Sequence, residues 1–311
     1  MKDIILTDPL PEFFLPHTQA RCELRYFDSA TDADFAASRG ILAYGHVTID
    51  AEMMDRCPQL QVISNHGVGV DHIDLQAAAA RGIPVGNTPG CVDAATADLT
   101  IALMLATARK LVVSDAFARG EEFTRYNPAL LIGQEVTGST LGIIGMGRIG
   151  CEVARRAQAF QMRLLYHNRT RRPDAEAELG VQYRSLDDLL QESDFVSLNC
   201  PLTPETTGMI GAAEFAKMKS SAILLNLARG QVVDTQALYE ALRDEKIQAA
   251  GLDVTDPEPL PRDHPLLRLS NVIITPHLGS ATGRTRHTMM QRTLENLFAG
   301  LDGQPLPNEV K

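Results

Sequence analysis

Three side chains that could bind a carboxylate and move a proton follow three predicted strands of this sequence. The strands are Ala222–Leu227, Ala249–Val254 and Val272–Thr275, and the side chains after them are, in order, Arg229, Glu258 and His277. Arg229 can bind an α-carboxylate in bidentate fashion, and His277 can give a proton to a forming alkoxide near neutral pH. A carboxylate such as Glu258, bonded to that imidazole, would orient it and favour its protonated form. Each has a structural explanation when taken alone, but together they predict a site for oxidation or reduction at a carbonyl.

A glycine motif of the type G-x-G-x-x-G lies between a predicted strand and a predicted helix. The strand is Leu141–Gly145, the helix is Arg148–Phe160, and the motif consists of Gly145, Met146, Gly147, Arg148, Ile149 and Gly150. Its first glycine permits a tight turn, its second lets the backbone approach a pyrophosphate, and its third lets the helix pack on the sheet. The helix N-terminus adds N–H donors and a partial positive charge. In this context the motif predicts a dinucleotide site.

The end of the next predicted strand, Arg163–His167, distinguishes between the two nicotinamide cofactors. The residues that follow it are Asn168, Arg169, Thr170, Arg171 and Arg172. An NAD site usually has an Asp or Glu here, bonded to the ribose 2′-hydroxyl. This turn has no such carboxylate and offers three guanidiniums to a 2′-phosphate. The turn therefore favours NADP(H), with NAD(H) possible, although the arginines could also form a solvated surface turn.

Two sets of strands that alternate with helices must position these residues. The first set is Ile4–Thr7, Gly40–Tyr44, Val62–Asn65 and Pro84–Val85, with helical stretches at Ala30–Ser38 and Asp50–Arg56. The second set adds Phe195–Asn199 to the strands named above, and a last helix is predicted at Ala281–Ala299. Several strands of the second set are continuous apolar runs, typical of strands covered on both faces. The pattern predicts an α/β fold with two doubly wound parallel sheets, Rossmann-like or flavodoxin-like.

A long helix is predicted between the two sets. Asp93–Arg119 contains no Gly or Pro, with Asp93 as its N-cap and Gly120 as its C-terminal stop. It is apolar around much of its circumference, so it must be buried on several sides. We expect it between domains or at the centre of a homodimer, and an ordinary core helix is the alternative.

Composition limits the class of protein. The chain has 311 residues, 44% hydrophobic and 22% charged, which suits a soluble protein with two cores. Its net charge of −10 argues against nucleic acid or an anionic membrane as the main partner. Five scattered cysteines suit reduced thiols and give no metal-binding pattern. With no signal peptide or membrane span in the sequence, we expect a cytoplasmic protein.

Six stretches together resemble the D-isomer-specific 2-hydroxyacid dehydrogenase family, and within it glyoxylate/hydroxypyruvate reductases, including 2-ketoaldonate reductases. They are Asn65–Asp71, Gly145–Gly150, Pro201–Thr203, Asn226–Asp234, Ala250–Pro259 and Pro276–Thr282. The resemblance implies a discontinuous substrate-binding domain (residues 1–98 and 283–311) and a dinucleotide-binding domain (99–282), with a cleft between them. It also implies a homodimer. One departure is His66, where the family usually has Ser or Thr, so the substrate pocket is expected to differ.

The resemblance also implies roles for individual residues. The catalytic residues would be Arg229, Glu258 and His277. The backbone N–H groups of Val68 and Gly69 would bind the substrate carboxylate, and Arg229, His277 and Ser280 would also contact the substrate. The cofactor would be lined by Pro201, Leu227, Asp253 and Gly279, in addition to the glycine motif and the turn at Asn168–Arg171.

The expected activity is hydride transfer from NAD(P)H to a small 2-oxo acid (glyoxylate, hydroxypyruvate or 2-ketogluconate), to give the D-2-hydroxy acid. Three alternatives share the fold. A formate dehydrogenase would pair its histidine with glutamine, which Glu258 disfavours. A phosphite or other D-2-hydroxyacid dehydrogenase would use NAD. A corepressor-like protein would sense the dinucleotide and bind peptide motifs, and it would be expected to carry extensions that this chain hardly offers.

Overall fold

The computed structural model describes residues 2–310, and these form two compact units. Unit 1 contains the described residues up to Val92 together with those from Thr282 onward. Unit 2 is the continuous segment Asp93–Ala281. Each unit is built on one parallel sheet, so the predicted α/β fold with two parallel sheets is confirmed.

The sheet of unit 1 has five parallel strands in the order β2-β1-β3-β4-β5. Their bounds are β1 Asp3–Thr7, β2 Cys22–Tyr26, β3 Gly40–Ala43, β4 Val62–Asn65 and β5 Val85–Gly86. This order is that of the flavodoxin-like doubly wound sheet, with its switch point between β1 and β3. β2 was not predicted from the sequence, because an edge strand that pairs only with β1 needs no continuous apolar run.

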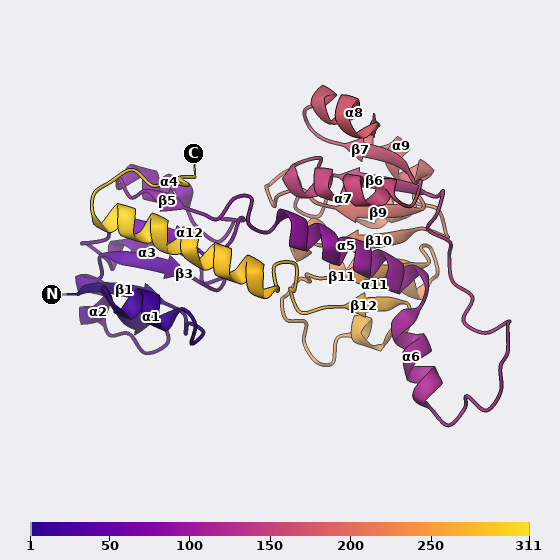
Figure 1. The fold of residues 1–311 in the computed structure, drawn as a ribbon, viewed down its shortest axis with the longest axis horizontal. Helices are drawn as coiled ribbons and strands as arrows, with labels where there is room; N and C mark the ends of the chain where they lie inside the picture. The colour runs from indigo at the N-terminus through magenta and orange to yellow at the C-terminus, as the bar shows by residue number, and fades with distance from the viewer. Residues whose placement is uncertain (1, 311) are drawn as a thin grey trace. The chain divides into compact units, whose positions relative to one another are not determined.

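Five helices cover the two faces of this sheet. They are α1 Leu15–Gln19, α2 Asp32–Ala37, α3 Ala51–Asp55, α4 Leu75–Ala80 and α12 Gly283–Leu301. The core of one face includes buried residues of α2, α3 and α4. On the other face, Met290, Leu294 and Leu297 of α12 pack with Ile5 and Val62 of the sheet. Figure 1 shows α12 lying across this sheet. The last helix of the chain therefore completes the core of a sheet made from its first ninety residues.

The sheet of unit 2 has seven parallel strands in the order β12-β11-β10-β9-β6-β7-β8. Their bounds are β6 Thr140–Ile144, β7 Arg163–His167, β8 Gln182–Tyr183, β9 Phe195–Leu198, β10 Ile223–Asn226, β11 Ala249–Leu252 and β12 Val272–Ile274. The first six in chain order follow the Rossmann pattern, whose switch point falls between β6 and β9. All four residues of β9, β10 and β11 are buried, as expected for strands covered on both faces.

Helices cover both faces of this sheet as well. They are α5 Asp93–Ala108, α6 Leu111–Arg119, α7 Arg148–Gln158, α8 Pro173–Leu179, α9 Leu186–Glu192, α10 Ala212–Phe215 and α11 Thr235–Arg243, with short 3₁₀ helices η1 Gly230–Val232 and η2 Pro265–Arg268. The core of one face contains residues of α5, α7 and α8. The core of the other contains residues of α9, α10 and α11.

The single helix predicted over Asp93–Arg119 is wrong. The helix begins at Asp93 and ends at Ala108, and α6 starts after Lys110, which has a left-handed φ of 52°. The segment that follows α6 comes back to the C-terminal end of α5, where the Gln134 N–H donates to the Ala108 carbonyl (2.8 Å). Gly120 does end α6, as predicted.

The apolar surface of the two helices is used differently. Much of α5 is buried within unit 2, including Leu103 and Met104. No residue of α6 is buried, and Leu111 and Val112 are more than half exposed. With the loop that follows, α6 extends away from the sheet of unit 2 (Figure 1). The excess apolar surface inferred from the sequence therefore belongs to α6 and its loop.

No disulfide joins any of the five cysteines, all of which lie within residues 2–310. None of the helices within residues 2–310 is long and apolar enough to cross a membrane.

Candidate active site

The loops that carry the proposed catalytic residues leave three neighbouring strands of unit 2. β10, β11 and β12 are adjacent in the sheet, and Arg229, Glu258 and His277 follow them in that order. The first two loops are in close contact at Gly230, where an added Cβ would lie 2.0 Å from the Thr255 carbonyl oxygen. Glycine is therefore the only residue that lets these loops approach to this distance. The structure brings all three residues to the carboxyl edge of one sheet.

His277 and Glu258 form a hydrogen-bonded pair. The distance from His277 Nδ1 to Glu258 Oε1 is 2.7 Å, and both side chains are about one third exposed (32% and 36%). His277 has a left-handed φ of 56°, which is uncommon outside glycine and concentrates at functional sites. Its backbone N–H donates to the Asp253 carbonyl (2.9 Å), which stabilises this conformation.

Asp253 holds the loop that carries His277. Its buried carboxylate accepts hydrogen bonds from Thr275 Oγ1 (2.6 Å) and from the N–H groups of Leu278 (2.7 Å) and Gly279 (2.8 Å). Three donors satisfy a buried charge that would otherwise be costly. Thr96 Oγ1 of α5 donates to the Gly279 carbonyl (3.2 Å). Asp253 was expected near the cofactor, and this positioning function was not predicted from the sequence.

Asn226 shapes the turn that carries Arg229. Its Nδ2 donates to the Arg229 carbonyl (2.9 Å), and its Oδ1 accepts from the Ala228 N–H (3.0 Å). Asparagine side chains often bond to the backbone two residues on in this way. Asn226 was not predicted as a functional residue, although an asparagine at a strand end was a signal for such a turn. The Arg229 side chain is half-buried, and its Nη1 donates to the Ala228 carbonyl (2.9 Å).

The glycine motif has the shape that a pyrophosphate needs. Gly145 has φ 101°, and a Cβ there would lie 2.5 Å from the Cys200 nitrogen. A Cβ on Gly150 would lie 2.3 Å from the Gly145 carbonyl oxygen, so both glycines are required by protein packing. A Cβ on Gly147 would meet no atom within 4 Å, so this glycine faces open space. No side chain caps α7, which leaves its first N–H groups for a ligand.

The arginine turn after β7 is partly neutralised by carboxylates of α8. Arg171 pairs with Glu176 (2.7 Å) and Arg172 pairs with Asp174 (2.6 Å). The bonds from Arg171 and from the Tyr166 hydroxyl lower the pKa of Glu176 to about 2, so it stays ionised. Two of the three guanidiniums predicted to bind a 2′-phosphate are thus ion-paired.

Arg169 differs from these two arginines. It is exposed, and its side chain forms no hydrogen bond or ion pair with any residue in the described part of the chain. Asn168 serves the glycine motif, since its Oδ1 accepts from the Met146 N–H (2.7 Å). Of the three arginines in this turn, Arg169 is therefore the one without an ion pair in the described chain. Its charge still reaches Glu205, whose pKa is lowered first by the hydrogen bond with Thr203 and to a smaller extent by Arg169.

The loop after β4 in unit 1 presents backbone N–H groups. Asn65 Nδ2 donates to the carbonyls of Gly67 (3.1 Å) and Gly69 (2.9 Å), and Asn87 Nδ2 donates to the Val68 carbonyl (2.8 Å). The N–H groups of Val68 and Gly69 donate to no residue within 2–310. Successive N–H groups of this kind can bind an anion. Asn65 therefore orients the loop so that its carbonyls are bonded and its N–H groups remain available.

The other predicted site residues also lie at the carboxyl edge of the unit 2 sheet. Pro201 is exposed after β9, Leu227 is buried after β10, and Gly279 and Ser280 follow His277, buried and half-buried respectively. Within the first turn of α7, Arg148 is exposed and Ile149 is half-buried, and Thr170 is exposed in the arginine turn.

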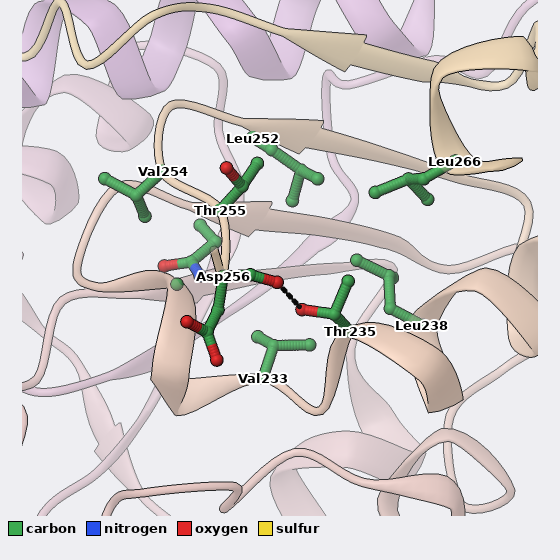
Figure 2. A pocket seen from close by; sticks show the side chains of 10 residues that line it. Val233, Thr235, Leu238, Leu252, Val254, Thr255, Asp256 and Leu266 are labelled. Atoms are coloured by element: carbon green, nitrogen blue, oxygen red, sulfur yellow. Dashed lines mark hydrogen bonds between the residues drawn. The ribbon is translucent and has the colours of Figure 1, made fainter. Parts of the chain in front are cut away.

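A small cavity lies behind the loops after β10 and β11. Its volume is about 10 Å³, which is at the lower limit for one water molecule. Val233, Leu238 and Leu252 line it, and Thr235 Oγ1 donates to the Asp256 carbonyl (2.8 Å) at its wall (Figure 2). It is a gap beneath the loops and is too small for a substrate.

Comparison with known proteins identifies the family. Residues 101–279 match the family described as D-isomer specific 2-hydroxyacid dehydrogenase, NAD binding domain. A glyoxylate reductase of Korarchaeum cryptofilum is 49% identical over 263 residues, covering 84% of this chain and 79% of the relative. A human glyoxylate reductase/hydroxypyruvate reductase is 42% identical over 301 residues, covering 94% and 92%.

A solved structure agrees over the whole chain. An NADPH-dependent glyoxylate/hydroxypyruvate reductase from Sinorhizobium meliloti, in complex with NADP and malonate, has a TM-score of 0.90 and 32% identity, covering 100% of this chain and 97% of that chain. The chain therefore belongs to the D-isomer specific 2-hydroxyacid dehydrogenase family, and it is an oxidoreductase that acts on 2-oxo or 2-hydroxy acids with a nicotinamide dinucleotide.

Proposed function

We propose that this chain is a glyoxylate/hydroxypyruvate reductase that uses NADPH and gives the D-2-hydroxy acid. The observation that carries the proposal is the bond between His277 Nδ1 and Glu258 Oε1 (2.7 Å), on loops next to the one that bears Arg229. Carbonyl reduction needs a proton donor, and a carboxylate-bound imidazole supplies one. Formate oxidation has no such need.

The bound dinucleotide supplies the hydride, and the chain's own residues do the rest. Arg229 binds the carboxylate of the 2-oxo acid and polarises its carbonyl through charge-assisted hydrogen bonds. Because Nδ1 of His277 bonds to Glu258, the proton passes to the carbonyl oxygen from Nε2. Glu258 stabilises the protonated imidazole, and Asp253 fixes the loop that holds it. The reverse reaction uses the same imidazole as the base.

Unit 1 is the substrate-binding domain in this proposal, and unit 2 is the dinucleotide-binding domain. The available N–H groups of Val68 and Gly69 would bind the substrate carboxylate. Pro201, Leu227 and Gly279 would line the cofactor, and Ser280 the substrate. The family match to an NAD binding domain at residues 101–279 supports the assignment of unit 2.

A preference for NADP(H) is the finer part of the proposal. The turn after β7 lacks an acidic residue at Asn168 for the ribose 2′-hydroxyl, and the Arg169 side chain forms no hydrogen bond or ion pair with the described residues. A 2′-phosphate would gain a charge-assisted contact with Arg169 without breaking an existing ion pair. The paired Arg171 and Arg172 would contribute less.

We also propose a homodimer that covers the surface of α6 and its loop. Leu111, Val112 and Ile132 are each more than half exposed on this segment, and Tyr126 is 82% exposed. Apolar patches of this kind usually mark an interface.

The experiment that tests the activity is a turnover assay with a panel of acids and both cofactors. Glyoxylate, hydroxypyruvate, pyruvate and 2-ketogluconate are each offered with NADPH and with NADH. We expect the highest kcat/KM for glyoxylate or hydroxypyruvate with NADPH. No turnover of either acid with either cofactor would refute the reductase activity, and a preference for NADH would refute the cofactor assignment alone.

A further inference from the structure

Two side chains at the carboxyl edge of the unit 1 sheet, Tyr44 and Arg286, are not used by the mechanism above. Tyr44 follows β3 and His66 follows β4, and these strands are neighbours. In a sheet of this order, ligands bind beyond the carboxyl ends of the strands near the switch point. His66 directly precedes the loop whose N–H groups are proposed to bind the substrate carboxylate. Tyr44 and His66 are therefore placed to contact the rest of the substrate.

His66 is a fixed and uncharged part of this edge. His66 is buried, with 6% of the residue exposed, and its Nδ1 is 3.0 Å from Thr293 Oγ1. Thr293 Oγ1 donates to the Met289 carbonyl (2.8 Å), so its oxygen accepts from a protonated Nδ1. Burial and, to a smaller extent, the charge of Arg286 lower the pKa of His66 to about 3, so the imidazole is neutral. It contributes no charge to a ligand.

Tyr44 is held against this ring. The two rings are stacked with centroids 4.9 Å apart and an interplanar angle of 26°, and Phe14 meets both edge-on. The Tyr44 side chain is partly buried, and its hydroxyl bonds to no other residue in 2–310. The stack thus fixes a phenol whose donor and acceptor remain available.

Arg286 brings the positive charge to this cluster. It lies on α12 seven residues before Thr293, two helical turns away on the same face. Its charge acts on both rings and opposes the rise that burial causes in the pKa of Tyr44. The guanidinium is half-buried, and it forms no side-chain hydrogen bond or ion pair with the residues that the structure describes. A partly buried cation of this kind is suited to an anionic or hydrogen-bond-accepting ligand.

We propose that Arg286 and Tyr44 form a subsite on unit 1 that binds a polar substituent at C3 of the 2-oxo acid. The subsite selects acids with a C3 hydroxyl or carboxylate, such as hydroxypyruvate, over pyruvate, whose C3 is a methyl group. The inference rests on the proposed reductase function, in which the loop at Val68 and Gly69 binds the carboxylate at C1. It deepens that function by naming the feature of the substrate that is recognised.

Glyoxylate makes the test specific, because it has no C3. In Arg286→Met, we expect kcat/KM for hydroxypyruvate to fall about 10- to 100-fold, the usual cost of a lost charge-assisted hydrogen bond. The values for glyoxylate and pyruvate should stay within about twofold of wild type. Tyr44→Phe, which removes only a hydroxyl, should reduce the hydroxypyruvate value by a smaller factor and leave glyoxylate unchanged. Arg284→Met is the matched control, because Arg284 is an exposed arginine on the same helix.

Two outcomes would overturn the proposal. An equal loss for glyoxylate and hydroxypyruvate in Arg286→Met would mean that Arg286 acts on the shared carboxylate or on the fold. No loss for either would mean that it contacts no substrate. If the methionine variant fails to fold, Arg286→Lys decides: it keeps the positive charge at this position but loses the planar guanidinium that would contact the C3 substituent, so kcat/KM should fall for hydroxypyruvate and stay unchanged for glyoxylate. Failure of wild type to reduce glyoxylate would instead count against the reductase function itself.

Discussion

His277 is positioned by its backbone as much as by its side-chain partner. Its left-handed φ of 56° and the bonds from its loop to Asp253 place the imidazole where Nδ1 meets Glu258. A residue in this conformation persists only where its surroundings compensate for the strain. The acid–base function at this position therefore depends on Asp253 as well as on the hydrogen bond between His277 and Glu258.

Replacing His277 tests proton transfer directly. General acid catalysis contributes roughly 10²- to 10⁴-fold, so His277→Gln should lower kcat by about that factor. Binding of NADPH, measured by fluorescence titration, should change little, because the glycine motif is untouched. A variant with near-normal kcat would remove His277 from the mechanism. Glu258→Gln should keep more activity than His277→Gln, because the amide oxygen can still accept a hydrogen bond from Nδ1 of the ring. Equal losses of kcat in the two variants would mean that Glu258 does more than orient the imidazole.

Arg169 tests the cofactor assignment. A charge-assisted contact is worth about 1.5–3 kcal/mol, or roughly ten- to a hundredfold in affinity. Arg169→Ala should weaken NADPH binding by this factor and leave NADH binding almost unchanged, as measured by titration of both cofactors. Arg171→Ala is the matched control and should have a smaller effect, because Arg171 is paired with Glu176. Equal weakening of both cofactors by Arg169→Ala would contradict the assignment.

High salt should weaken NADPH binding more than NADH binding, because Arg169 is exposed.

At the scale of elements, the approach of two loops at Gly230 can be tested by adding one methyl group. A Cβ would lie 2.0 Å from the Thr255 oxygen, so Gly230→Ala must push apart the loops that carry Arg229 and Glu258. Overpacking costs about 1–3 kcal/mol, and we expect the upper end here because the obstacle is backbone. Both the free energy of unfolding, measured with urea, and kcat should be lower than in wild type. Gly283→Ala is the control, since a Cβ there meets no atom within 4 Å. Wild-type kcat in Gly230→Ala would mean that loop spacing does not matter to the chemistry.

Some of the strands and helices could be predicted from the sequence, and others could not. Apolar runs such as Val62–Asn65 and Arg163–His167 coincide with β4 and β7, because buried parallel strands have a continuous local signal. The edge strand β2 has no such signal and was not predicted. The break at Lys110 was also not predicted, because it comes from the chain that returns at Gln134, a contact between distant residues.

The candidate site was predictable to a similar degree. Arg229, Glu258 and His277 follow strands, so their shared edge could be inferred from the order of elements. The ion pair of Arg171 with Glu176 was not predicted, because it depends on how α8 leaves the turn. Asp253 and Asn226 were not predicted as loop-positioning residues, since the bonds that assign this function are backbone contacts seen only in three dimensions.

For the whole molecule, the buried His66 makes stability depend on pH. Its pKa of about 3 in the fold lies below the ordinary value of 6.5, so the unfolded chain binds a proton that the folded chain does not. The contribution of His66 to the free energy of unfolding is then fully present above pH 6.5, and it decreases as the pH falls toward 3. The loss should be about 2 kcal/mol between pH 8 and pH 5. Urea unfolding at both pH values would measure this decrease in the free energy of unfolding. Because His66→Gln lacks the imidazole, its decrease between the two pH values should be smaller than that of wild type by this amount. Identical pH dependence in the two proteins would contradict the assignment.

Assembly is the other prediction at this scale. Light scattering at micromolar concentration should give twice the mass of one chain. Val112→Asp, on the exposed face of α6, should shift the protein toward monomers, because it places a charge in the proposed apolar interface. Leu267→Asp, at a site 36% exposed elsewhere in unit 2, should leave the dimer intact. A monomeric wild type would refute the proposed homodimer.

The place of α12 in the chain has a consequence for synthesis on the ribosome. Unit 2 is complete at Ala281, whereas the sheet of unit 1 has to wait for Met290, Leu294 and Leu297 to cover Val62 and its neighbours. Although its strands are translated first, unit 1 becomes a finished core last, which reverses the usual order in which N-terminal domains fold. During that interval an apolar sheet face is exposed on the nascent chain, and this is the stage at which a chaperone would bind.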